Sequence, residues 1–172
     1  MDCIKMVVTM NPCRCGHYPD LSRCTCTAGE RSRYLGKISG PLLDRMDICV
    51  EAQPVTYGEM GEYKKNEDSA AIRARVEAAR EIQKERFKGL PIRCNGEMGG
   101  GQIRRFCPLN KEENEFMEYA FSTLGISVRM YGKILKVART AADLDGREQI
   151  LKKDLSEAVS YVRIRQRYWK NG

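Results

Sequence analysis

The residues best suited to chemistry stand together near the start of the sequence, in the stretch MNPCRCGHYPDLSRCTC. It holds two Cys-x-Cys pairs with eight residues between them, Cys13 with Cys15 and Cys24 with Cys26. Four thiolates can enclose a tetrahedral Zn²⁺, and such a complete shell leaves no open position, which is typical of a structural metal and not a catalytic one. His17, the single histidine, lies between the pairs and could replace one thiolate or hydrogen-bond to it.

The expected cellular compartment decides how these thiols are interpreted. The longest apolar run near the start, Met6 to Val8, is far too short for a membrane span or a signal-peptide core, so we expect a cytoplasmic protein without membrane contact. In a reducing cytosol, closely spaced thiols are more often metal ligands or redox groups than disulfides. The pattern therefore favours zinc over free thiols or a redox pair. Four isolated cysteines are expected to be small buried hydrophobic residues: Cys3, Cys49, Cys94 and Cys107.

The composition is that of a folded protein. With 172 residues, 42% hydrophobic and 31% charged, the chain is long enough for one globular domain or two small units, and it is neither disordered nor fibrous. Its net charge of +7 is uneven, because residues 1–65 hold nine Lys/Arg and eight Asp/Glu whereas residues 66–172 hold 21 and 15. The densest basic-aromatic cluster could contact a phosphate backbone, but we favour a solvated helix end: Arg163, Arg165, Arg167, Tyr168, Trp169 and Lys170.

The first half of the chain is expected to hold short strands and loops. Ile4–Met10 and Met46–Ala52 are apolar runs that each stop before a proline, which is typical of short buried strands. Between them, Leu42 and Leu43 offer a short buried anchor. Two strands and a cysteine loop cannot cover both faces of a sheet, so we expect this half to be one piece of an α/β domain.

From Asn66 onward the pattern is helical. Ser69 is the expected N-cap of a helix over residues 70–87, and the glycine run Gly99–Gly101 follows it. The remaining predicted elements are a short segment over 102–107 and helices over 111–124, 127–143 and 151–165. The predicted organisation is an α/β piece over residues 1–65 followed by an all-α helical bundle over 66–172, mainly helical overall.

Four motifs in a fixed order carry a resemblance to a known family: MNPCRCG, RYLGKISGPLLDRMDICVE, GGQIRRFC and RMYGKILKVARTAADLDG. Together they resemble the C-terminal part of the magnesium-chelatase-like AAA+ ATPases of the ComM/YifB type. The resemblance covers nearly the whole chain. It implies a nucleotide-binding α/β core followed by a helical lid, with ATP and Mg²⁺ at the subunit boundaries of a homo-oligomeric ring, usually a hexamer.

One departure from the family pattern bears on activity. Members carry a phosphate loop and an acidic Walker B strand upstream of the asparagine-containing strand, but this sequence has no G-x-x-x-x-G-K-[ST] string. The glycine run at Gly99–Gly101 is no substitute, because no Lys-Ser/Thr pair follows it. We therefore expect a fragment that begins at the sensor strand and that alone neither binds ATP tightly nor hydrolyses it.

The resemblance also implies roles for three residues. Asn11 matches sensor 1, whose amide can donate to a γ-phosphate oxygen or orient the attacking water. Arg45 matches the arginine finger, which stabilises the charge of the transition state in the neighbouring subunit's site. Arg129 matches sensor 2, in the first turn of a helix with Ser127 as N-cap, where the helix N-terminus also favours phosphate.

Two of these residues also have a simpler structural interpretation. Asn11 could open an Asx-Pro turn, and Arg45 could join a surface salt-bridge cluster with Asp44 and Asp47. Arg139, ten residues after Arg129, is expected on nearly the same helix face but could equally be an ordinary helix-surface arginine, so it is left out of the site. The pair Arg104 and Arg105 could contact phosphates beside the glycine run, although a simple helix start is favoured there.

Two hypotheses for function follow. The first is the C-terminal part of an ATP-hydrolysing motor that acts on DNA, in branch migration, recombination or natural transformation, with zinc holding the loop between Asn11 and Arg45. The second is a zinc-stapled basic helical module that binds nucleic acid or a protein partner without enzymatic activity. Magnesium insertion into a porphyrin follows only from the family's name and would need other subunits.

Overall fold

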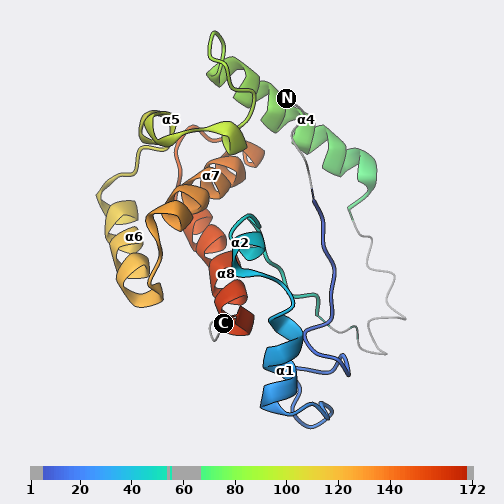
Figure 1. Ribbon diagram of the computed structural model, residues 1–172. Helices are drawn as coiled ribbons and strands as arrows, with labels where there is room; N and C mark the ends of the chain where they lie inside the picture. The colour runs from blue at the N-terminus through green and yellow to red at the C-terminus, as the bar shows by residue number, and fades with distance from the viewer. Residues whose placement is uncertain (1–5, 54, 56–66, 170–172) are drawn as a thin grey trace. The chain divides into compact units, whose positions relative to one another are not determined.

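The computed structural model describes residues 6–53, 55 and 67–169 (Figure 1). These residues form seven α-helices and one 3₁₀ turn, and they divide into two compact units. Unit 1 contains the described residues up to Met46 and those from Ile164 onward, and unit 2 contains those from Asp47 to Arg163. In this part of the chain no helix is long and apolar enough to cross a membrane.

Unit 2 is a bundle of helices, which confirms the predicted all-α bundle and the mainly helical character of the chain. Its elements are α4 (Ser69–Arg86), the 3₁₀ turn η1 (Asn95–Glu97), α5 (Gly100–Phe106), α6 (Lys111–Leu124), α7 (Val128–Leu144) and α8 (Lys152–Trp169), of which the last six residues belong to unit 1.

Polar side chains set where these helices begin. The Asn110 side chain accepts hydrogen bonds from the first backbone amides of α6, and the Glu113 carboxylate accepts one from the Asn110 backbone amide, which gives this helix the predicted bounds. Ser127 accepts from the Met130 amide at 3.2 Å and is the N-cap of α7, as predicted. The cap of α4 is Asp68, which accepts from the Ala71 amide at 2.7 Å. The predicted cap, Ser69, is one residue too late. Aspartate and serine are both preferred at an N-cap, so the sequence alone does not distinguish Asp68 from Ser69.

The core of unit 2 is built around α7, which packs against α4, α5 and η1 (Figure 1). Ala138 and Ala142 on α7 are completely buried, and such small side chains let neighbouring backbones approach closely. Gly132 serves the same purpose, because a Cβ there would lie 3.4 Å from Ile103 Cδ1 of α5. The buried hydrophobic cluster is formed by Phe87, Met98, Cys107, Met117, Ala120, Ile126, Ile134, Leu135, Ala138, Ile150, Leu155, Ala158, Val159 and Val162.

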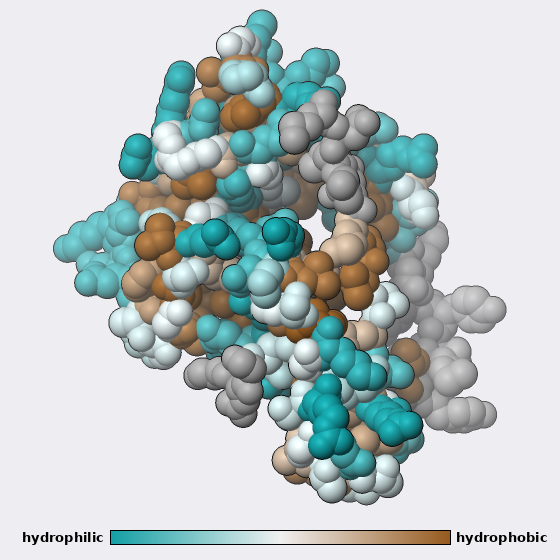
Figure 2. Space-filling model, in the orientation of Figure 1, coloured by the Kyte–Doolittle hydropathy of each residue, from teal (hydrophilic) through white to brown (hydrophobic). Residues whose placement is uncertain are grey.

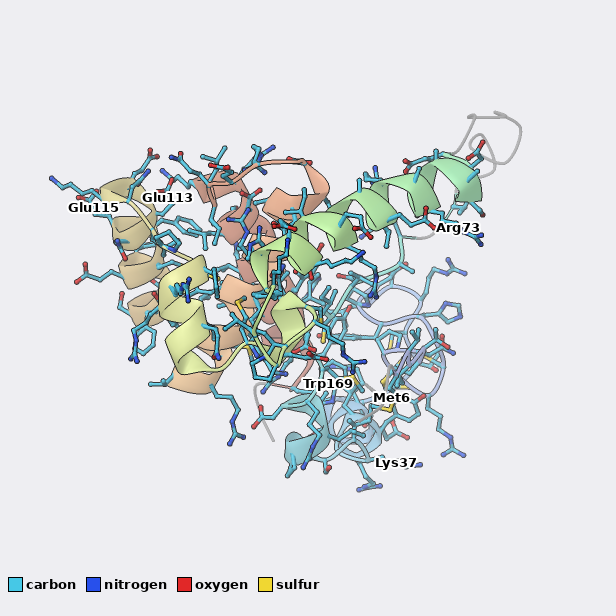
Figure 3. The ribbon with its side chains drawn as sticks, turned by 90° about the horizontal axis from the view of Figure 1, so that it is seen from above. Met6, Lys37, Arg73, Glu113, Glu115 and Trp169 are labelled. Carbon is cyan, nitrogen blue, oxygen red and sulfur yellow. The ribbon has the colours of Figure 1, made fainter. Side chains whose placement is uncertain are left out.

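The N-terminal half of α4 extends away from this core. Residues 69–78 are all exposed, and Arg73, labelled in Figure 3, lies on this extended part. Burial begins only at Ala79 and continues with Gln83. The helix is therefore anchored to the bundle by its second half alone.

Unit 1 contains two short helices that were not predicted, α1 (Ala28–Leu35) and α2 (Gly40–Leu43). Thr27 and Glu30 form a capping box at the start of α1, and Figure 2 shows hydrophilic side chains on the visible face of this region. Of the expected anchor, Leu43 is buried and Leu42 is only partly buried. Helices of eight and four residues are too short for their apolar periodicity to stand out in the sequence.

The predicted strands are not formed, so this part of the α/β prediction is wrong for the described residues. Residues 6–10 and 46–52 have no regular secondary structure, and Ile4 and Lys5 lie outside the described residues. Val7 is 92% exposed and Val50 is 72% exposed. A strand needs hydrogen bonds to a neighbouring strand. A run of apolar, β-branched residues indicates only that these side chains would pack well in a sheet when such a neighbour is present. No neighbouring strand exists in the part of the chain described here.

The predicted domain boundary between residues 65 and 66 stays a prediction, since residues 56–66 are outside the described part.

Candidate active-site residues and a four-cysteine centre

The four cysteines of the two Cys-x-Cys pairs converge in unit 1. All four Sγ atoms lie within 4.8 Å of one another. The Sγ atom of Cys13 is 3.3 Å from that of Cys15 and 3.8 Å from that of Cys24, and Cys15 is 3.6 Å from Cys24. Four sulfurs at about 2.3 Å from a tetrahedral Zn²⁺ would be separated by about 3.8 Å. The donor set and its spacing therefore fit this metal.

Local turns bring the two pairs together. The Gly16 amide donates to the Cys13 carbonyl at 3.1 Å, and Gly16 adopts a positive φ of 84°, which L side chains rarely tolerate. The Tyr18 amide then donates to the Cys13 Sγ at 3.5 Å. On the second pair, the Cys24 amide donates to the Asp20 carbonyl at 2.9 Å. Amides that donate to a thiolate sulfur orient it and stabilise its charge, as is usual around bound metals.

The proton affinities of the thiols differ strongly within the cluster. A backbone hydrogen bond at His17 is the main cause that lowers the pKa of Cys15 to about 5. A backbone hydrogen bond at Cys15 lowers the pKa of Cys26, but desolvation and the neighbouring sulfurs outweigh it and raise the value to about 11. Adjacent thiolates repel one another, so all four ionise together only when a cation neutralises them.

The other sulfur and nitrogen candidates are placed as follows. His17 is exposed and is not part of the group of converging ligand atoms. The seven described cysteines form no disulfide. Cys107 is buried, as predicted for an isolated cysteine, whereas Cys49 and Cys94 are only half-buried and Cys3 lies outside the described residues.

Asn11 lies at the edge of the cysteine centre, two residues before Cys13, and its side chain is exposed. Its amide group is beside Gly16, where an added Cβ would be 3.7 Å from the Asn11 Nδ2. The alternative of an Asx-Pro turn has no support, since none of the hydrogen bonds among the described residues involves the Asn11 side chain. The turn at Gly16, which brings the cysteines together, therefore also lies against this asparagine.

Arg45 follows α2 and is exposed. Its Nη1 donates to the Pro41 carbonyl at 3.0 Å. The two carboxylates that flank it are engaged elsewhere, because Asp44 pairs with Arg165 at 2.6 Å and Asp47 pairs with Lys133 at 2.9 Å. The surface cluster considered as the alternative for Arg45 is therefore not formed.

Arg129 lies in the first turn of α7, in unit 2, and is exposed. Its position next to the amides of a 17-residue helix suits an anionic ligand. Asn11 and Arg45 belong to unit 1, whereas Arg129 belongs to unit 2.

Comparison with known proteins places this arrangement in a family. Residues 66–162 match the family model described as magnesium chelatase, subunit ChlI C-terminal, and residues 3–60 match magnesium chelatase, subunit ChlI. The chain belongs to the magnesium chelatase ChlI family.

Curated relatives of this magnesium-chelatase-like chain are longer proteins. Competence protein ComM of Haemophilus influenzae is 39% identical over 167 residues, which cover 95% of this chain and 32% of the relative. The uncharacterized YifB proteins of Salmonella typhimurium and Escherichia coli are 37% and 39% identical over 161 residues, covering 93% of this chain and 31% of each relative. The chain thus spans about a third of the length of the curated relatives it matches.

The magnesium-chelatase-like bundle also contains a buried polar network that sequence reasoning missed. Arg139 is 1% exposed, so the alternative of an ordinary helix-surface arginine is wrong. Its Nε donates to Asp143 Oδ1 at 3.1 Å, and its two terminal nitrogens donate to the carbonyls of Arg147 and Glu148. Burial lowers the pKa of the Arg139 guanidinium, and the charge of Asp143 opposes this effect. The sequence shows the spacing of four residues between Arg139 and Asp143. Exposed ion pairs on helix surfaces have the same spacing, so it does not indicate a buried pair.

Asp143 joins three elements of the bundle. It accepts from both terminal nitrogens of Arg86, at 2.7 and 2.5 Å, and from Asn95 Nδ2 at 2.7 Å. The Asn95 backbone amide in turn donates to Gln83 Oε1 at 3.1 Å. The network ties α4 and η1 to α7, the helix that carries Arg129 at its other end.

Proposed function

We propose that this chain supplies the subunit-boundary part of an ATP-hydrolysing AAA+ motor that assembles as a homo-oligomeric ring, most simply a hexamer. In this proposal Asn11 is sensor 1, Arg45 is the arginine finger and Arg129 is sensor 2. ATP and Mg²⁺ are cofactors of the whole protein, and the chain alone does not hydrolyse ATP because it lacks a phosphate loop. Membership of the magnesium chelatase ChlI family supports the ATPase assignment.

The observation that carries the proposal is the state of Arg45. An arginine finger must present its guanidinium to the equatorial oxygens of a phosphoryl group in the neighbouring subunit. Arg45 is exposed, its flanking carboxylates are paired with other cations, and a hydrogen bond to one backbone carbonyl holds it. Exchanging that bond for charge-assisted bonds to phosphate is favourable.

A complementation experiment tests the role of Arg45. The chain is mixed with a full-length relative of the family whose own arginine finger is replaced by alanine, and ATP hydrolysis is measured. We expect the unmodified chain to restore turnover and Arg45→Ala to abolish this effect, since an arginine finger contributes about 10³-fold or more to kcat.

The matched control is Arg33→Ala, an exposed arginine on α1 in the same unit, which should restore turnover as well as the unmodified chain. Equal restoration by the Arg45→Ala chain and the unmodified chain would contradict the assignment of the finger.

The four-cysteine centre is proposed to hold one Zn²⁺ through Cys13, Cys15, Cys24 and Cys26. Four thiolates would complete the shell, so the metal stabilises the loop and takes no part in the reaction. This loop begins two residues after Asn11, and α1 and α2 connect it to Arg45. The zinc would therefore stabilise the stretch of chain that carries both proposed catalytic residues of unit 1. We also propose a cytoplasmic location, with which the lack of disulfides among the seven described cysteines is in keeping.

DNA is the proposed substrate of the motor. The excess of basic residues in residues 66–172 supports a polyanionic partner, and one relative is named a competence protein. Binding of single-stranded DNA by the chain alone, with an affinity that falls steeply as salt rises, combined with failure to restore turnover, would favour the alternative function of a binding module.

A further inference from the structure

The end of α8 is only in part the solvated helix end expected from its sequence, with Arg163 and Arg167 exposed. Its last residues, from Ile164 to Trp169, belong to unit 1. There, three side chains contact three different segments of that unit, and all three are only partly exposed: Arg165, Tyr168 and Trp169. We call these three residues the α8 clasp.

Arg165 holds the segment next to the proposed finger. Its Nη2 donates to Asp44 Oδ1 at 2.6 Å, and the Arg165 side chain is only 21% exposed. Asp44 is the C-cap of α2 and immediately precedes Arg45. The ion pair therefore restrains the backbone from which the Arg45 side chain extends. A partly buried pair with a short contact is stronger than the ordinary exposed surface pair.

Trp169 holds the end of α1. Its indole Nε1 donates to the carbonyl of Leu35 at 3.1 Å, and Figure 3 shows the labelled Trp169 close to the ribbon of this unit. Leu35 is the last residue of α1 and is buried. The last carbonyls of a helix have no partner inside the helix. The Leu35 carbonyl also accepts from the Ile38 amide at 3.1 Å, so the indole adds a second hydrogen bond at this end of α1.

Tyr168 reaches the cysteine centre. Its ring packs edge-to-face on Tyr18, with the ring centroids 5.9 Å apart and the planes at 80°. The backbone amide of this same Tyr18 donates to the Cys13 Sγ, and the Arg31 guanidinium lies 4.9 Å from the centre of the Tyr18 ring. Aromatic pairs of this geometry add stability beyond the area they bury. The clasp thus contacts the residue that orients one of the four sulfurs.

We propose that the α8 clasp positions the arginine finger, with Arg165 as the positioning residue. It does so by fixing α1, α2 and the cysteine loop against one helix end, so that Arg45 extends from a defined backbone. This inference rests on the proposed function of Arg45. Arg165 itself contacts no nucleotide in this scheme and acts through Asp44.

The first experiment measures the clasp without any reference to ATP. Trp169 is the single tryptophan of the chain, so quenching of intrinsic fluorescence by acrylamide reports its exposure alone. We expect Arg165→Ala and Tyr18→Ala to raise the quenching constant at least two-fold. Arg163→Ala, an exposed arginine on the same helix, is the matched control and should leave it unchanged. Identical quenching in all four proteins would overturn the clasp.

The second experiment measures positioning in the complementation assay described above. We expect Arg165→Ala to lower the restored kcat about ten-fold with little change in KM for ATP. Arg165→Lys should recover part of this loss. The exchanged pair, Asp44→Arg combined with Arg165→Asp, should have a higher kcat than either of these two single changes alone. A changed quenching constant with an unchanged kcat would overturn the positioning role and leave a purely structural clasp. If Arg45→Ala is also without effect in that assay, the proposed finger has failed, whereas the fluorescence result still decides the clasp.

Discussion

Replacement of Asp143 by alanine is expected to lower the free energy of unfolding of the chain by about 3–5 kcal/mol, the usual cost of removing one partner from a buried ion pair. The Asp143 side chain is completely buried and accepts hydrogen bonds from Arg86, Arg139 and Asn95. Without it, two guanidiniums would share a buried site with no anion to balance them. Their mutual repulsion and lost hydration explain the size of the effect.

Urea unfolding followed by far-ultraviolet circular dichroism measures this change. The matched control is Asp145→Ala, which removes a carboxylate two residues later on the surface, where it pairs with Arg147 and Lys153. This control should shift the midpoint much less, because solvent screens exposed ion pairs. A midpoint shift for Asp143→Ala no larger than that of Asp145→Ala would show that the network contributes little to stability.

The second large effect is expected at the cysteine centre. Protein purified without chelator should contain about one zinc per chain, and Cys24→Ser should reduce this to less than about a quarter, because a four-thiolate shell loses one of its ligands. Metal analysis of the purified proteins measures both values. Cys94→Ser is the matched control, since Cys94 lies in unit 2 outside the converging group, and its zinc content should match that of the unmodified chain.

The affinity for zinc should also fall as the pH is lowered. In the absence of metal the pKa of Cys26 is raised to about 11, so this thiol is protonated at neutral pH and must release a proton when it binds zinc. Lower pH favours the protonated thiol and therefore weakens zinc binding.

The zinc content at neutral pH tests the proposed metal centre itself. Less than about a quarter of an equivalent of zinc in the unmodified chain would contradict it.

Local features of the sequence were sufficient for most of unit 2. The N-cap Ser127 and the bounds of α6 follow from side chains that satisfy nearby amides within a few residues, and the helical periodicity of the apolar residues needs no distant partner. The convergence of the four cysteines could also be predicted, because one short loop contains them all. The family motifs directed attention to Asn11, Arg45 and Arg129 for the same reason, since each motif is a continuous stretch of sequence.

Burial and long-range pairing were decided only by the tertiary structure. Arg139 has the sequence environment of a surface arginine, and only the packing of α4 and η1 on α7 encloses it with Asp143. Arg165 pairs with Asp44, which lies 121 residues earlier in the chain, and no local pattern indicates that contact. The two predicted strands failed for the same physical reason. Helix caps and turns are satisfied by neighbours in sequence, whereas strand pairing, buried charge and the α8 clasp depend on which distant segments the fold brings together.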